Sequence, residues 1–71
     1  MKAQYLGNEE FKVVKGNLEI RQFNHDLFGR RIEAKKIDKK NDLVVFCNPN
    51  DSEFKELVVF LHNFKVENGY K

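Results

Sequence analysis

The fold is decided by residues 48–69, which read NPNDSEFKELVVFLHNFKVENG. Apolar side chains recur there with the i, i+3, i+4, i+7 spacing of one helix face, at Phe54, Leu57, Val58, Leu61 and Phe64. Asn50 and Glu53 have the spacing of a capping box, and Asn68-Gly69 can end a helix in the left-handed conformation. The stretch therefore predicts one amphipathic helix over about residues 51–67, with its apolar stripe packed on a core.

The chain before this helix predicts strands at about residues 3–6, 11–14, 18–23, 28–37 and 43–47. Gly16-Asn17 suits a tight hairpin turn, and an apolar residue out of register predicts a bulge near Lys35-Lys36. Residues 43–47 are apolar at every position, which is typical of a central strand covered on both faces, with Cys47 as a buried thiol. The expected fold class is α+β, an antiparallel meander of four to five strands with the helix packed on one face.

Seventy-one residues predict a single domain, residues 1–71, with a small core that buries only about 60% of the surface exposed by the unfolded chain. Cys47 is the only cysteine, so no disulfide within the chain can reinforce that core. His25, His62 and Cys47 lack the spacing of a metal site, and we expect no metal or cofactor. A homodimer that shares a core is a possible alternative source of stability.

Hydropathy and composition indicate where the protein is located and what kind of genome encodes it. No segment approaches the roughly 20 apolar residues that cross a bilayer, and the first residues do not resemble a signal peptide. A lone cysteine suits a reducing compartment, so we expect a cytoplasmic protein without membrane contact. The composition, rich in lysine, asparagine and phenylalanine, suggests a bacterial or phage genome.

Residue types that carry catalysis are scarce, and the chain is not expected to be an enzyme. Ser52 is the only serine, threonine is absent, and Ser52 falls in the first helical turn, where it can assist capping. The four glycines are scattered, and none of them precedes the helix in a phosphate-binding loop. No catalytic residue is assigned.

Basic residues gather in the middle of the chain. Residues 21–40 carry seven basic and three acidic side chains, a net charge of +4, whereas residues 41–60 carry one basic and four acidic side chains, a net charge of −3. Basic side chains beside an exposed aromatic ring can bind phosphates and stack on a base. The predicted site for nucleic acid or another partner comprises Arg21, Phe23, Arg30, Arg31, Lys35 and Lys36. The alternative is a solvated strand that uses lysine to prevent edge-to-edge aggregation.

Residues 15–23, KGNLEIRQF, resemble the second strand of the positive-cofactor-four family of single-stranded-DNA-binding proteins. The family's last strand and helix are similar to residues 44–47, the Asn-Pro that follows them, and the helix with Phe54 and Leu57. The resemblance implies a curved four-stranded sheet, a C-terminal helix, a homodimer and nucleic-acid binding on the sheet. Two features depart from the family: Asp42-Leu43-Val44 replaces its basic-Gly-Ile step, and the strand over 28–37 is longer.

Two functions follow from these features. The first is binding of single-stranded nucleic acid through a basic sheet face. The second is a small protein-binding inhibitor or adaptor, such as a phage or mobile-element factor that docks on a host or defence protein, with Phe23 and Arg31 as anchors. A continuous basic face favours nucleic acid, whereas mixed charge with an exposed apolar patch favours a protein partner.

Overall fold

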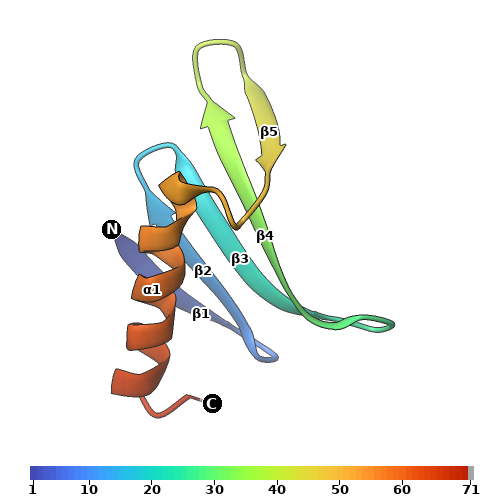
Figure 1. The fold of residues 1–71 in the computed structure, drawn as a ribbon, viewed down its shortest axis with the longest axis vertical. Coiled ribbons are helices and arrows are strands. Elements are labelled where there is room, and N and C mark those ends of the chain that lie inside the picture. Colours follow the sequence, from blue (N-terminus) through green and yellow to red (C-terminus); the bar gives the residue numbers. More distant parts are fainter. Residues whose placement is uncertain (71) are drawn as a thin grey trace.

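The computed structural model describes residues 1–70. Five strands form one antiparallel sheet in the order of the chain, and one helix follows them (Figure 1). The elements are β1 (Lys2–Gly7), β2 (Glu10–Lys15), β3 (Leu18–His25), β4 (Gly29–Asp38), β5 (Leu43–Cys47) and α1 (Ser52–Glu67). This architecture confirms the predicted α+β class, the meander and the position of the helix on one face of the sheet.

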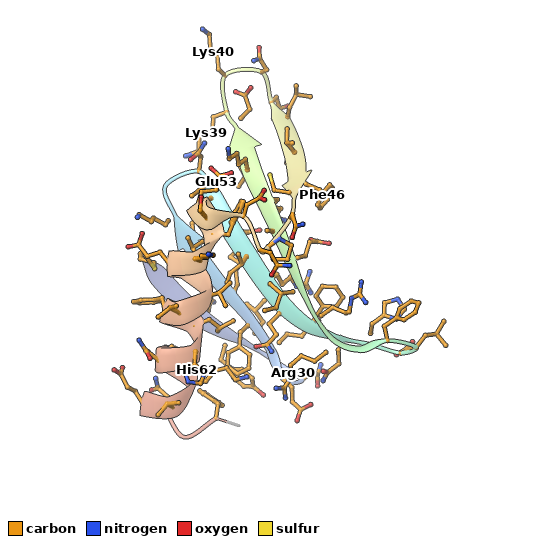
Figure 2. The ribbon with its side chains drawn as sticks, in the orientation of Figure 1. Arg30, Lys39, Lys40, Phe46, Glu53 and His62 are labelled. Atoms are coloured by element: carbon orange, nitrogen blue, oxygen red, sulfur yellow. The ribbon has the colours of Figure 1, made fainter. Side chains whose placement is uncertain are left out.

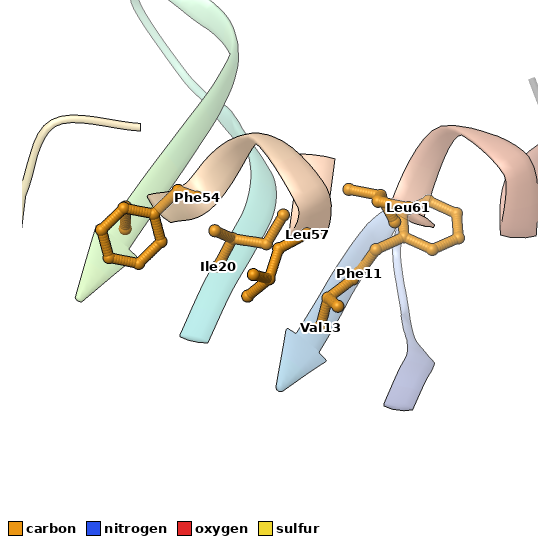
Figure 3. Close-up of a cluster of buried hydrophobic side chains, with 7 residues drawn as sticks. Phe11, Val13, Ile20, Phe54, Leu57 and Leu61 are labelled. Atoms are coloured by element: carbon orange, nitrogen blue, oxygen red, sulfur yellow. The ribbon is translucent and has the colours of Figure 1, made fainter. Parts of the chain in front are cut away.

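The core lies between α1 and the first strands of the sheet (Figure 3). Phe54, Leu57 and Leu61 are the buried residues of α1, and they confirm the predicted stripe. The sheet contributes Phe11, Val13, Ile20 and Ala34, which the strand register places on one face. Since side chains of a strand alternate between faces, one face of the sheet is packed against the helix and the other is open.

The strand pairs are more regular than the sequence indicates. The register of β4 with β3 and with β5 runs without a shift, so the bulge predicted near Lys35-Lys36 is wrong. The irregularity lies in β1, between Tyr5 and Gly7. Phe28 belongs to the β3–β4 turn, and Gly29, with φ of 73°, begins β4. The β2–β3 turn at Gly16-Asn17 is present, with φ of 57° at Gly16.

The start of α1 differs from the predicted capping box. Asp51 is the N-cap residue, and its side chain makes no capping hydrogen bond. Asn50 donates its backbone N–H to Oδ1 of Asn48 at 2.9 Å, and Glu53 pairs with Lys36 of β4. The carboxylate of Glu53 therefore ties the helix to the sheet and does not close a local cap. The predicted stop is present, with Gly69 at φ of 75°.

β5 is an exposed edge strand, so the prediction of a central, covered strand is wrong. Four of its five residues are more than half exposed: Leu43 56%, Val44 51%, Val45 52% and Phe46 67%. Cys47 is half-buried, so the prediction of a buried thiol also fails. An α-helix with its side chains is about 10–12 Å wide. Five strands spaced about 4.8 Å apart span roughly 19 Å, so one helix leaves part of the sheet uncovered.

Substitution Leu57→Ala should lower the free energy of unfolding by about 2–5 kcal/mol, because Leu57 is fully buried in the core and alanine leaves a cavity. Val59→Ala on the exposed side of the same helix should cost less than about 0.5 kcal/mol. Urea denaturation followed by circular dichroism measures both values. Equal losses for the two variants would contradict this description of the core.

Candidate functional site

The six residues predicted to form a site lie on both sides of the sheet. Cross-strand pairing places Arg21, Phe23, Arg31 and Lys35 on the open face, with Phe23 directly opposite Arg31. Arg30 and Lys36 project to the side that carries α1: Lys36 Nζ lies 2.8 Å from a carboxylate oxygen of Glu53, and Arg30 lines a hollow with His62 (Figure 2). The predicted basic strand is therefore divided between two surfaces.

Carboxylates neutralise much of the positive charge on the open face. Glu19 is 8% exposed, and its carboxylate oxygens lie 2.8 Å from Nζ of Lys35 and 3.7 Å from Nζ of Lys12. Arg21 donates to Glu10 at 3.2 Å and stands opposite Glu33 on β4. The open face thus has mixed charge and no continuous basic patch among the described residues.

A smaller aromatic and basic cluster remains near the β3–β4 turn. The guanidinium of Arg31 lies 5.3 Å from the ring centroid of Phe28, and that of Arg21 lies 6.0 Å from the centroid of Phe23. His25 packs on Phe28 at 4.9 Å between centroids, and Phe28 is 66% exposed. We call Arg21, Phe23, His25, Phe28 and Arg31 the tip cluster.

The basic run ends in a turn that contains its own carboxylate. Lys39 and Lys40 lie at the outer end of the β4–β5 hairpin (Figure 2). Asp38 accepts hydrogen bonds from the side chain of Asn41 at 2.9 Å and from the backbone N–H groups of Lys40 and Asn41. The Asn41 side-chain bond, followed by the backbone bonds, lowers the pKa of Asp38. This carboxylate therefore stays charged within the basic turn and holds its shape.

On the side away from β3, half of β4 has no strand beside it. β5 pairs only with residues 34–38, and extending this register by two residues would place Pro49 opposite Ile32. Proline has no N–H, so it cannot donate to the ladder, and the chain turns away towards α1. The backbone N–H of Ile37 bonds to the carbonyl of Asn17, on the β3 side.

Alternate residues of an antiparallel strand direct their backbone groups to opposite sides, and β4 has no register shift. Since Ile37 faces β3, the N–H and C=O groups of Arg30 and Ile32 face the side on which β5 lies. Among residues 1–70, the backbone hydrogen bonds outside the helix and strand ladders do not involve Arg30 or Ile32. These residues form a short free edge of the sheet.

A groove of about 790 Å³ lies beside this free edge, between β4, the β5–α1 linker and α1. Its lining comprises Arg30, Arg31, Ile32, Pro49, Asn50, Lys55, Val58 and Val59, and we call it the β4–α1 groove. Its apolar surface comes from Ile32, Pro49 and the two valines. Its positive charge comes from Arg30 and Arg31 on the strand and from Lys55 on the helix. No acidic residue is among its lining in the part of the chain that the structure describes.

Positive charge extends into an adjoining hollow. Arg30, Ile32 and Val58 line both spaces, and the hollow continues to Lys65. Burial, then repulsion by Arg30, lowers the pKa of Lys65, while attraction by Glu9 opposes this shift. Lys65 also lies 5.3 Å from the ring centroid of Phe11 and donates to Gln22 at 3.3 Å. The groove and hollow together present unneutralised cations above an apolar floor.

Several residues of this groove have no signal in the sequence that would assign them to a site. Lys55 lies off the apolar helix stripe and looks like an ordinary solvated residue. Only the β4–β5 register shows that Pro49 lies close to Ile32. In the sequence, Val59 and Val66 fall beside the main apolar stripe, and this spacing indicates a second apolar surface on the helix.

No protein family, curated protein or solved structure matches the chain. Within residues 1–70, no cluster of three or more histidine, cysteine or carboxylate side chains could hold a metal ion. The same residues include no helix with the length and apolar character that spanning a bilayer requires.

Substitution Asn41→Ala should raise the pKa of Asp38 towards its ordinary value of 3.8, because the largest cause of the lowered pKa is removed. The lowered pKa stabilises the turn above pH 3.8, and this contribution is lost as the pH falls through the folded-state value. NMR titration of the Asp38 carboxyl resonance measures the shift. Asn63→Ala on α1 is the control, and an unchanged Asp38 titration in Asn41→Ala would contradict the assignment.

Proposed function

We propose that the protein is a small binding protein, an inhibitor or adaptor, that takes up an extended acidic segment of a partner protein in the β4–α1 groove. The observation that carries the proposal is the free backbone edge of Arg30 and Ile32 beside a groove lined by cations and apolar side chains. A peptide strand can add to such an edge through backbone hydrogen bonds, and pockets for alternate side chains supply specificity.

Charge and shape define the chemistry of the segment. Ile32, Val58 and Val59 offer apolar contacts to side chains that point into the groove. Arg30 and Lys55 stand on opposite walls, one on the strand and one on the helix, so carboxylates of the segment meet cations on both. Every second side chain of an added strand faces the groove, so an extended peptide matches this arrangement when its groove-facing positions include both apolar and acidic residues.

Fluorescence anisotropy tests the proposal at low salt with a labelled hexapeptide of sequence VVEEVV, in which each face of the extended chain carries both valine and glutamate. Arg30→Glu should weaken binding roughly tenfold or more, because a like charge beside the bound carboxylates costs several kcal/mol. Lys39→Glu, which makes the same charge change on the β4–β5 turn outside the groove, is the matched control and should have a small effect.

NMR shifts of the backbone amides locate the peptide. The largest changes are expected at Arg30 and Ile32, since their N–H groups receive new acceptors. The same peptide with lysine in place of glutamate should not bind. Equal effects of the two charge reversals, or binding without shifts at Arg30 and Ile32, would contradict strand addition at this edge.

Single-stranded nucleic acid is a second candidate, and the tip cluster is the observation that favours it. Arg31 has no carboxylate partner among the ion pairs of residues 1–70, and Phe28 offers an exposed ring beside it. An exposed ring and a free guanidinium can stack on a base and contact a phosphate. The neutralised lysines of the open face make this the weaker of the two proposals.

If the tip cluster binds single-stranded DNA, Phe23→Ala should weaken binding of a labelled oligothymidine by about 1–3 kcal/mol, because one stacking surface is removed. The affinity should also fall by about 0.7 log units per log unit of salt for each phosphate neutralised. Anisotropy at several salt concentrations measures both effects, with Lys2→Ala as a control distant from the tip. No binding at tens of micromolar protein in low salt would exclude this candidate.

A further inference from the structure

The outer edge of β5 is the most exposed apolar strand surface of the molecule. Leu43, Val44, Val45 and Phe46 stand together on the hairpin that extends past the rest of the sheet, and Phe46 projects away from α1 (Figures 1 and 2). Edge strands of monomeric proteins are commonly blunted by a charged residue, a proline or a bulge. Residues 43–47 contain none of these devices.

The opposite edge of the sheet is better protected. β1 carries Lys2 and has a register shift at its end, and Tyr70 packs on Tyr5 with 4.8 Å between ring centroids. These are the features that discourage pairing between edges. The two edges of the sheet therefore differ, and β5 is the one that is open to another strand.

The backbone of β5 is complementary to itself. Val45 pairs with Lys36 on the side that faces β4, so the N–H and C=O groups of Val44 and Phe46 point outward. An antiparallel second copy centred on Val45 places Val44 opposite Phe46 of the second copy and Phe46 opposite its Val44. This register gives all four outward groups of each strand a partner, in four hydrogen bonds across the two-fold axis.

The side chains fit the same register. Val44 and Phe46 of each copy project to the open face, where Ile37 is the β4 neighbour of Val44. Val45 meets its own counterpart on the helix side, and Leu43 meets Cys47. Every cross-strand pair is apolar, and aromatic–β-branched pairs such as Val44 with Phe46 are among the favourable ones.

The charges beside β5 do not oppose pairing of two copies. The lysines of β4 nearest to β5 are already neutralised, because Lys35 pairs with Glu19 and Lys36 pairs with Glu53. The turn that precedes β5 carries Lys39 and Lys40 together with Asp38 and Asp42, so its formal charges cancel. The antiparallel arrangement is therefore selected by the backbone and side-chain register.

We propose that β5 pairs with β5 of a second copy of this chain about a two-fold axis at Val45, forming a continuous ten-stranded sheet. This pairing closes on itself, because the same strand serves both copies and no further edge of that kind is left. It leaves the free edge at Arg30 and Ile32 unoccupied, so it does not depend on peptide binding in the β4–α1 groove.

Disulfide trapping tests the register. In this arrangement Val45 and its counterpart form a pair without mutual hydrogen bonds, with Cα atoms about 4.5 Å apart, which lies in the range of disulfides. In a Cys47→Ser background, Val45→Cys should form a covalent dimer under mild oxidation. Val66→Cys in the same background, at another exposed valine on α1, is the matched control and should stay monomeric at equal concentration.

Sedimentation equilibrium of the unmodified chain should give a concentration-dependent mass that approaches twice 8.4 kDa, and Phe46→Glu should shift the mass to the monomer. Phe46 is exposed, so circular dichroism should show an unchanged fold in that variant. A clean monomer at high concentration would overturn the proposal. A dimer unaffected by Phe46→Glu, or equal crosslinking of both cysteine variants, would also overturn it.

Discussion

The width of one α-helix limits how this sheet can be covered. A helix with its side chains is about 10–12 Å wide, and five strands at about 4.8 Å spacing are wider. α1 packs on Phe11, Val13 and Ile20 of β2 and β3, and its buried stripe is fully used there. β5 and the first half of β4 therefore remain at an exposed margin. Both proposed interaction surfaces lie at this margin because the helix does not cover it.

Pro49 divides that margin into two different surfaces. Before it, β5 continues the sheet and presents an apolar outer edge with outward backbone groups on Val44 and Phe46. At Pro49 the ladder cannot continue, since proline has no N–H, and the chain crosses to α1. Beyond this point Arg30 and Ile32 have a free edge beside a groove walled by the helix. One residue thus separates a surface suited to self-pairing from one suited to an acidic peptide.

Ion pairs determine which cations remain available for binding. Glu19 and Glu53 neutralise Lys35 and Lys36, so half of the predicted basic strand serves to hold the sheet and the helix together. The cations that line the groove, Arg30, Arg31 and Lys55, take part in none of the ion pairs of residues 1–70. Positive charge along the chain was therefore a poor guide to positive charge on the surface, because pairing depends on neighbours far apart in the sequence.

The sequence by itself determined the elements of this protein, and tertiary structure decided their exposure. Period-two alternation before residue 43 and helical spacing after residue 53 predicted the meander, the helix and its buried stripe, because each pattern depends on local backbone geometry. The apolar run at Leu43–Cys47 was misassigned as a central strand, since an apolar strand looks the same in sequence whether a helix covers it or not. The division of Arg30 and Arg31 between faces followed from strand alternation. The groove beside Arg30 arose only because the β4–β5 register placed Pro49 opposite Ile32 and α1 lay across the neighbouring strands.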